Sequence, residues 1–500
     1  MNKYIFKIFF FITLYVLGSC KNLNSDETPN IVLIVADDLG WSDVSYMGSS
    51  FYETSNIDKL SLNGMTFLNG YASSANCAPS RATMLTGKYH PHHGIYTVRN
   101  SDRGNTKTRK IIPIKTKTKL EHNHFIISEM LKSKGYVNGH FGKWHMGPLG
   151  YYPENMGFDI NVGGNESGGP GSYFPPYRNV NKNLKVDPKE EYLTDRLGTE
   201  VVNFIEKNKD NKFFAYVPFY SVHTPIQAKP EYESKYKTKK SDDFHNRADY
   251  AGMIQSLDEN IGKILNKIKE LNLENNTLII FTSDNGGIRS ISNQHPLRAG
   301  KGSYYEGGIR VPLIISWPGK IKPGSTSYER VSNIDFFPTI KKIVGYEKKL
   351  DLDGMDLTNI FKEKQLKKRS LFFHFPVYLE PYDVLKDDGT DPLFRTRPGS
   401  VLIKGDWKLH KYYENNKIEL YNLKNDISES NNLSKINKEK TTELLNELEA
   451  WLIEKNAPIP SEPNLLFSQK YNDSLINLIK KNKLSGRVNK NEKTSDLNPF

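Results

Sequence analysis

The chain has 500 residues, of which 37% are hydrophobic, and a formal net charge of +12 from 69 Lys+Arg against 57 Asp+Glu. This length accommodates one large domain and a smaller one, with enough apolar residues for a globular enzyme. The positive charge suits an anionic partner, although solvated lysines explain it equally well. The chain has no zinc-finger, helix-turn-helix or RNA-binding pattern, so we expect no nucleic-acid partner.

Residues 1–20 have the features of a secretory signal. Lys3 and Lys7 precede a short apolar run, and small residues lead up to Cys20. The run is too short to span a bilayer as a helix, and this order of charged, apolar and small residues is that of a signal peptide. The letters "LGSC" resemble a bacterial lipobox, in which Cys20 becomes lipidated; cleavage nearby with loss of Cys20 is the alternative. We expect an exported bacterial protein, either periplasmic or held at the outer membrane by an N-terminal lipid anchor only.

Four apolar segments, at residues 30–38, 135–147, 212–225 and 277–287, are predicted as strands buried in a parallel sheet. Helical patterns at 125–135 and 250–272 alternate with them, which predicts an α/β sandwich with a large mixed, mostly parallel sheet. Ligands of such sheets bind beyond the carboxyl ends of the strands. The polar residues expected at that edge are Asp37, Asp38, Lys143, His145, His223, Asp284 and Asn285.

Cys77 lies in the segment "NCAPSRATMLTG", residues 76–87. Once Cys20 is lipidated or removed, Cys77 has no disulfide partner. Pro79 and Gly87 suit the first turn and the end of a short helix. Cys77 then lies at the helix N-terminus, where anions are stabilised, and Arg81 is one turn further along. A single thiol in an oxidising compartment is expected to be inert and buried, or chemically altered.

Asp37, Asp38, Asp284 and Asn285 offer oxygen ligands without nitrogen or sulfur. Such a set favours calcium or magnesium over zinc. The alternative is that adjacent aspartates cap the following helix or turn. A candidate nucleophile, a divalent cation, an arginine, two lysines and two histidines together indicate a site for a tetrahedral oxyanion ester, either a phosphate or a sulfate.

The chain divides into a catalytic domain at 28–365, a smaller C-terminal α+β subdomain at 366–467 and a tail at 468–500. Residues 399–426 alternate like short antiparallel strands, and residues 437–456 have helical periodicity. The Lys/Asn-rich tail is expected to be partly docked. "HPHHG" at 90–94 is interpreted as a loop packed beside the Cys77 helix rather than a metal cluster. The basic stretch 105–119 is interpreted as a solvated loop that could lie near the cleft.

Four motifs together carry a family resemblance. "CAPSR" followed by "TG" matches C-x-P-S-R-x-x-x-L-T-G, and "GKWHMG", "SDNGG" and "GKGSYYEGGIRVP" follow in the family's order. Over residues 28–460 the chain resembles a type I sulfatase, which implies the alkaline-phosphatase/sulfatase-like fold. The resemblance also implies that Cys77 is oxidised to formylglycine by a formylglycine-generating or anaerobic sulfatase-maturating enzyme.

The same resemblance implies a role for each site residue. Formylglycine at position 77 would join Asp37, Asp38, Asp284 and Asn285 around one calcium ion. Arg81 and Lys143 would hold the aldehyde hydrate and the sulfate oxygens. His145 would be the base that collapses the hydrate, whereas His223 and Lys301 would serve the leaving group.

The leading hypothesis is hydrolysis of sulfate esters on an acidic polysaccharide or its oligosaccharides. "FFHFPVYLEP" at 372–381 resembles polysaccharide sulfatases, including those of marine bacteria that act on algal ulvan or carrageenan. His374, Arg395 and Arg397 are predicted to bind the sugar; alternatively, they fix the subdomain to the main sheet. The rival functions are a phosphonate or phosphodiester hydrolase of the same superfamily and a non-catalytic glycan-binding lipoprotein.

Overall fold

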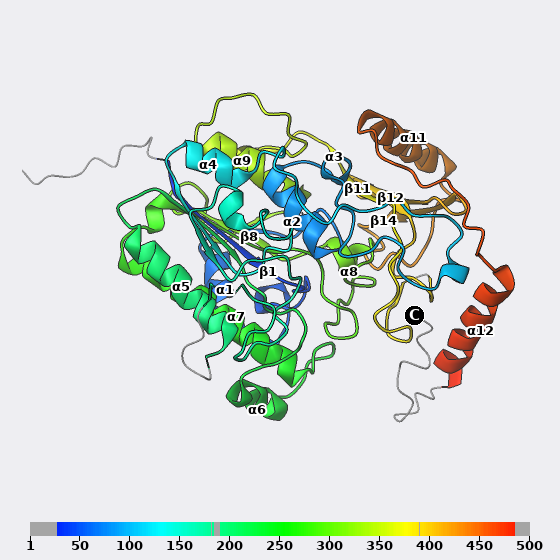
Figure 1. The fold of residues 1–500 in the computed structure, drawn as a ribbon, viewed down its shortest axis with the longest axis horizontal. Coiled ribbons are helices and arrows are strands. Elements are labelled where there is room, and N and C mark those ends of the chain that lie inside the picture. The colour runs from blue at the N-terminus through cyan, green and yellow to red at the C-terminus, as the bar shows by residue number, and fades with distance from the viewer. Residues whose placement is uncertain (1–27, 182, 185–190, 390, 486–500) are drawn as a thin grey trace, which may run out of the picture.

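The computed structural model of the protein describes residues 28–181, 183–184, 191–389 and 391–485 (Figure 1). The predicted signal segment, its lipobox and Cys20 lie outside these ranges, as do residues 486–500 of the predicted tail. Among the described helices, none is long and apolar enough to cross a membrane. The described residues thus include most of both predicted domains and residues 468–485 of the tail.

The main sheet of the described chain has eight strands in the order β5-β4-β6-β1-β7-β8-β2-β9. The strands from β5 to β7 are parallel, whereas β8 is antiparallel to both of its neighbours, and β2 and β9 are parallel. The predicted mixed, mostly parallel sheet is confirmed. The strands are β1 (Asn30–Ala36), β2 (Met65–Phe67), β4 (Val137–Phe141), β5 (Ile160–Val162), β6 (Phe213–Pro218), β7 (Thr277–Ser283), β8 (Leu313–Ser316) and β9 (Ser325–Ser327).

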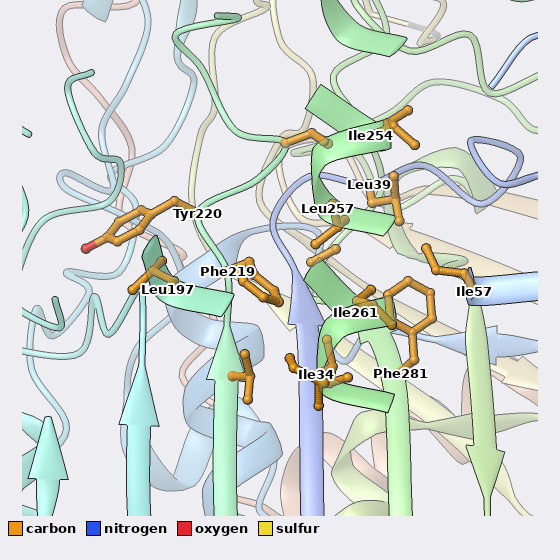
Figure 2. Packing of buried hydrophobic residues seen from close by; sticks show 14 of the residues in the cluster. Ile34, Leu39, Ile57, Leu197, Phe219, Tyr220, Ile254, Leu257, Ile261 and Phe281 are labelled. Atoms are coloured by element: carbon orange, nitrogen blue, oxygen red, sulfur yellow. The ribbon is translucent and has the colours of Figure 1, made fainter. Parts of the chain in front are cut away.

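The central strands are apolar at successive positions because helices cover both faces of the sheet (Figure 1). On one face, Ile34 packs with Leu257 and Ile261 (Figure 2). On the other face, Leu33 belongs to a cluster with Leu85. The first face carries α1 (Ser55–Leu62), α5 (Leu193–Lys207) and α7 (Ala248–Glu270), and the second carries α2 (Cys77–Thr86), α4 (Ile127–Ser133) and α9 (Phe336–Ile343).

The predicted antiparallel subdomain is also confirmed. Within the described residues, its sheet has the strands β11 (Ser370–Phe375), β12 (Gly399–Lys404), β13 (Trp407–Tyr412) and β14 (Lys417–Asn422), each antiparallel to the next. Leu409 of β13 packs with Leu444 and Leu448 of α11 (Lys438–Glu454), which covers one face of this sheet. A further helix, α12 (Gln469–Ser485), follows on the same side of the molecule (Figure 1).

Short elements complete the described chain. A small parallel pair joins β3 (Gly70–Tyr71) to β10 (Val331–Ser332). The short helices are α3 (His90–His93), α6 (Pro230–Thr238), α8 (Glu306–Ile309) and α10 (Thr358–Phe361), with 3-10 turns η1 (Ser45–Met47), η2 (Thr106–Thr108), η3 (Pro153–Asn155), η4 (Glu274–Asn276) and η5 (Asn333–Asp335). The segment 90–94 packs beside α2 as predicted, with His93 Nε2 3.0 Å from Thr83 Oγ1.

A buried charged cluster joins the subdomain to the catalytic domain. Lys408 of β13 lies 2.9 Å from a carboxylate oxygen of Glu306 and 2.9 Å from one of Glu429, and all three side chains are inaccessible to solvent. A buried lysine is tolerated only when its charge is paired, so removing either partner would be strongly destabilising. Because Glu306 follows the loop that carries Lys301, this cluster fixes the subdomain relative to that loop.

The basic stretch 105–119 differs from the predicted solvated loop. Arg109 and Ile111 are buried, and Ile111 forms a β-bridge with Pro463. Asn464 donates from Nδ2 to the carbonyl of Arg109 at 2.7 Å. The stretch is held in place because a segment more than 300 residues further along the chain packs over it, a contact that no local pattern reveals.

Candidate active site

The carboxyl ends of neighbouring strands bring the predicted polar residues into one cluster. Asp37 and Asp38 follow β1, while Asp284 and Asn285 follow β7, its hydrogen-bonded neighbour. His223 lies beyond β6, on the other side of β1, and Lys143 lies beyond β4. Since these strands are parallel, their ends meet at one edge of the sheet.

Cys77 is the first residue of α2 and its thiol faces the acidic residues. Its side chain is 2% exposed, and Sγ lies 3.6 Å from Asp37 Oδ1 and 4.0 Å from Asp38 Oδ1. The helix ends at Gly87, where a φ of 64° is the left-handed conformation that favours glycine. Burial raises the pKa of the Cys77 thiol to about 12, so the unmodified side chain is a neutral thiol at neutral pH.

The site contains a set of oxygen atoms suited to a hard cation. Among the described residues, one ligand atom from each of Asp37, Asp38, Asp284 and Cys77 lies within 4.8 Å of all the others. Asn285 donates from Nδ2 to Asp38 Oδ1 at 2.8 Å, whereas its buried Oδ1 has no hydrogen-bond partner within the described chain. A buried carbonyl oxygen without a partner is costly, and a bound cation would satisfy it. These residues therefore fit calcium or magnesium.

Each carboxylate of the cluster is paired with its own cation. Lys143 Nζ lies 2.7 Å from Asp37 Oδ2, and Lys301 Nζ lies 2.6 Å from Asp38 Oδ1. Arg81 binds Asp284 Oδ2 through Nε and Nη2, both at 2.8 Å. These opposite charges balance, which makes their complete burial tolerable. The cations also converge on the same small volume, where they can bind the oxygens of an anionic group.

The electrostatic environment differs between the two neighbouring aspartates. Burial, together with the Asp284 carboxylate, raises the pKa of Asp37 to about 7. Burial also acts to raise the pKa of Asp38, but Lys301 outweighs it and holds that pKa well below its usual range. In return, Asp38 outweighs the effect of burial on Lys301 and holds the pKa of this lysine well above its usual value. Lys301 therefore keeps its proton.

The two histidines are held by backbone contacts near these charges. His145 has a φ of 62°, and its backbone N–H donates to the Asn165 carbonyl at 2.9 Å. His223 Nδ1 lies 2.7 Å from the Thr224 carbonyl, and its Nε2 lies 3.7 Å from Asp38 Oδ2. Burial and nearby lysines push the pKa of His145 well below its usual value and that of His223 to about 3. Both imidazoles are therefore neutral at neutral pH in this state.

Two glycines that the sequence reasoning missed pack against the histidine rings. A Cβ atom at Gly168 would lie 2.6 Å from His145 Cε1, and one at Gly169 would lie 2.9 Å from His223 Nδ1. Both distances are shorter than van der Waals contact, so any side chain there would displace a ring. Glycine and proline, as in "SGGPG" at 167–171, are typical of a loop, but only the tertiary structure places this loop over the histidines.

The predicted sugar-binding residues occupy different environments. His374 is fully buried, with Nδ1 2.8 Å from Ser400 Oγ and Nε2 3.1 Å from the Pro458 carbonyl. Both ring nitrogens are thus occupied inside the subdomain, which corrects the prediction that His374 binds sugar and agrees with the structural alternative. Arg397 forms ion pairs with Asp391 and Glu414. Only Arg395 reaches the catalytic cluster, where its Nη1 donates to the Lys301 carbonyl at 3.0 Å.

Comparison with known proteins identifies the family. The family model "Sulfatase" matches residues 29–346, and the model "N-sulphoglucosamine sulphohydrolase, C-terminal" matches residues 300–457. The chain therefore belongs to the sulfatase family, whose members are sulfuric ester hydrolases.

Individual relatives agree with this assignment. The chain is 35% identical to a sulfatase of Formosa agariphila over 87% of its own length and 90% of that protein. It is 31% identical to the N-acetylgalactosamine-6-sulfatase of Mus musculus, over 70% of this chain and 69% of that protein. The crystal structure of Ps i-CgsB in complex with k-i-k-neocarrahexaose superimposes with a TM-score of 0.70 and 31% identity, covering 92% of this chain and 99% of that one.

We expect the substitution Gly168→Ala to lower kcat/KM for a small aryl sulfate by roughly tenfold to a hundredfold, because the new methyl group would displace the His145 ring. The melting temperature should change little, since Gly168 is a half-buried loop residue outside the hydrophobic core. Gly389→Ala serves as the control, because a Cβ at that position meets no atom within 4 Å. Wild-type rates in Gly168→Ala would show that the position of His145 does not limit catalysis.

Proposed function

We propose that the protein hydrolyses sulfate esters of a sulfated polysaccharide or its oligosaccharides, with residue 77 acting as formylglycine beside a calcium ion. The observation that carries this proposal is the position of Cys77. It lies at the start of α2, against Asp37 and Asp38, where Lys143 and Lys301 also converge. The raised pKa of its buried thiol makes an unmodified Cys77 a poor nucleophile.

The residues that would hold the cation are Asp37, Asp38, Asp284, Asn285 and the side chain at position 77. When bound, the cation would neutralise developing charge on the sulfate oxygens. The formylglycine hydrate would supply a hydroxyl group as nucleophile. Calcium rather than magnesium is proposed from the family resemblance, since both ions accept an all-oxygen ligand set.

The remaining side chains have roles that follow from their positions. Arg81 and Lys143 would bind sulfate oxygens and stabilise charge there. A carboxylate of the cluster would accept the hydroxyl proton; Asp37 Oδ1, at 3.6 Å from Sγ, is placed for this. As the bond from sulfur to the ester oxygen breaks, Lys301, which keeps its proton, would supply that proton to the leaving oxygen, and His223 would contact the same oxygen. His145 would accept the proton of the second hydrate hydroxyl while the bond between the formylglycine carbon and the sulfate oxygen breaks. Inorganic sulfate would then leave and the aldehyde would return.

A glycan substrate is supported by the surroundings of the site and by related proteins. Arg395 lies next to Lys301, where its guanidinium charge can attract a carboxylate or a second sulfate. Ps i-CgsB, which is 31% identical, was crystallised with a neocarrahexaose. We therefore propose a sulfated carbohydrate substrate, with algal glycans such as carrageenan or ulvan as the first to test. Export, a lipid anchor at Cys20 and a maturation enzyme remain part of this proposal.

The test is a comparison of ester classes with matured protein. We expect kcat/KM for 4-nitrophenyl sulfate to exceed that for 4-nitrophenyl phosphate and for a phenyl phosphonate monoester by on the order of 10²-fold. Sulfate release from defined sulfated oligosaccharides would then identify the sugar. Faster phosphonate or phosphodiester hydrolysis would favour the rival enzyme class. Binding of sulfated oligosaccharides without release of sulfate from any ester would indicate a glycan-binding protein.

A further inference from the structure

The chain continues beyond its match to the family models and returns to the catalytic domain. The C-terminal model ends at residue 457. After it, the Glu462 carbonyl accepts from the backbone N–H of Ile112 at 2.8 Å, and the backbone N–H of Ser468 donates to the Lys107 carbonyl at 2.9 Å. The chain then forms α12, which begins at Gln469. This segment thus lies beyond the family models and is docked on the basic stretch 105–119.

Apolar contacts hold α12 against the side of the active-site region. Ile479 shares a buried cluster with Ile111 and Phe394, and Leu475 and Ile476 pack against the same cluster. Phe394 directly precedes Arg395, the residue that contacts the Lys301 carbonyl. The helix therefore lies beside the segment 393–395, whose last residue contacts the backbone of Lys301. Figure 1 shows it running along the outer edge of the subdomain.

Between α12 and this segment lies a cavity of about 240 Å³. Asn472 lines it from α12, Lys110 from the basic stretch, and Asn415 from the turn between β13 and β14. Arg395 and Arg397 also line it. Sites that enclose drug-sized ligands measure roughly 300–1,000 Å³, so this cavity suits one sugar unit rather than a longer segment.

The wall of the cavity carries unbalanced positive charge. Arg397 is bound to both carboxylates of the wall, Asp391 and Glu414. Neither Lys110 nor Arg395 forms an ion pair with a carboxylate in the described part of the chain. Arg395 instead donates to the carbonyls of Glu380 and Lys301. Lys110 and Arg395 thus border a cavity that also contains amide groups. The carboxylates on which the charge of Arg395 acts, Glu380 and Asp387, lie outside the lining of this cavity.

The cavity adjoins the catalytic cluster at Arg395, which contacts the Lys301 carbonyl. A narrow hollow next to it is lined by Lys301 and Ser303 and shares Phe394 and Arg395 with the larger cavity. Lys301 in turn contacts Asp38 through its ammonium group. A chain of sugars bound with one sulfate at the catalytic residues could therefore place another unit in the cavity.

We propose that this cavity binds an anionic sugar unit, sulfated or carboxylated, of the same glycan whose sulfate ester is cut at the catalytic site. Lys110 and Arg395 bind its anionic group, since such charge-assisted hydrogen bonds are about twice as strong as neutral ones. Asn415 and Asn472 supply amides for its hydroxyl groups. The proposal rests on the proposed function and makes the enzyme selective for oligosaccharides over sulfated monosaccharides.

Binding is measured on full-length Cys77→Ala protein, which cannot turn over, by isothermal titration calorimetry. The probes are hexasaccharides of carrageenan, ulvan and chondroitin sulfate, each compared with its desulfated form. We expect at least one sulfated probe to bind, and Lys110→Met and Asn415→Asp to weaken its binding about tenfold or more, about 1.4 kcal/mol. Asn415→Asp keeps the side-chain shape and adds a negative charge. The exposed Lys115 lies on the same stretch away from the cavity, so Lys115→Met should bind as the wild type does.

A second measurement uses the matured enzyme and compares the hexasaccharide with 4-nitrophenyl sulfate. In Lys110→Met, the ratio of the two kcat/KM values should fall about tenfold, mainly through KM for the oligosaccharide. Equal losses on both substrates, unchanged binding in both variants, or no binding of any sulfated probe by the parent protein would overturn the proposal. Failure of the proposed function is distinct from these results, because matured protein would then release no sulfate from any ester.

Discussion

Replacing Cys77 by alanine is expected to lower kcat/KM for every sulfate ester by at least on the order of 10³, about 4 kcal/mol of transition-state stabilisation. The reason is that residue 77 is proposed to supply the nucleophile, and its side-chain atom lies within 4.8 Å of carboxylate oxygens of Asp37, Asp38 and Asp284. Folding should be preserved, because alanine fits the buried start of α2 without strain. The measurement is steady-state kinetics together with the melting temperature.

The matched experiment keeps the cysteine and omits the maturation enzyme during expression. This protein should fold normally and be nearly as inactive as Cys77→Ala, because burial raises the pKa of the thiol to about 12 and keeps it protonated. Active material should contain an aldehyde at residue 77, detected by mass spectrometry as a peptide lighter than its cysteine form. Full activity with an unmodified Cys77 would contradict the proposed chemistry.

Removal of the metal is expected to abolish activity and to lower the melting temperature. A ligand at 100 times its dissociation constant stabilises the folded state by about 2.7 kcal/mol, so calcium returned to chelated protein should raise the melting temperature measurably. The substitution Asp284→Asn should eliminate this calcium-dependent rise as well as the activity. Because it also weakens the buried pair with Arg81, the relevant quantity is the difference between melting temperatures with and without calcium.

Asp258→Asn provides the control for this experiment. Asp258 is a buried carboxylate of α7 that accepts hydrogen bonds from Asn56 and Ile57, away from the oxygen cluster. Its replacement should lower stability but leave the calcium-dependent rise intact. Sulfate release by metal-free protein, or an unchanged calcium response in Asp284→Asn, would refute the assignment of the cation site.

Much of the fold and of the candidate site could be predicted because the relevant patterns are local. The continuous apolar run of β1 signals a strand covered on both faces, and Asp37 directly follows it. Pro79 and Gly87 delimit α2 by their own backbone preferences. Since parallel strands end at one edge, the sequence also predicted that Asp284 would join Asp37. His374 was misjudged because its β-strand pattern does not reveal which face is covered by a second segment.

The sequence by itself determined the family motifs, the α/β and antiparallel sheets, and the residue types available at the strand ends, because these follow from short-range periodicity and from the order of motifs. Only the tertiary structure decided which charges pair, since Asp38 and Lys301 lie 263 residues apart. It alone placed Gly168 against His145 and brought α12 beside Lys110 and Arg395. Such contacts arise from packing between distant segments, where shape and burial, rather than any local preference, select the partner.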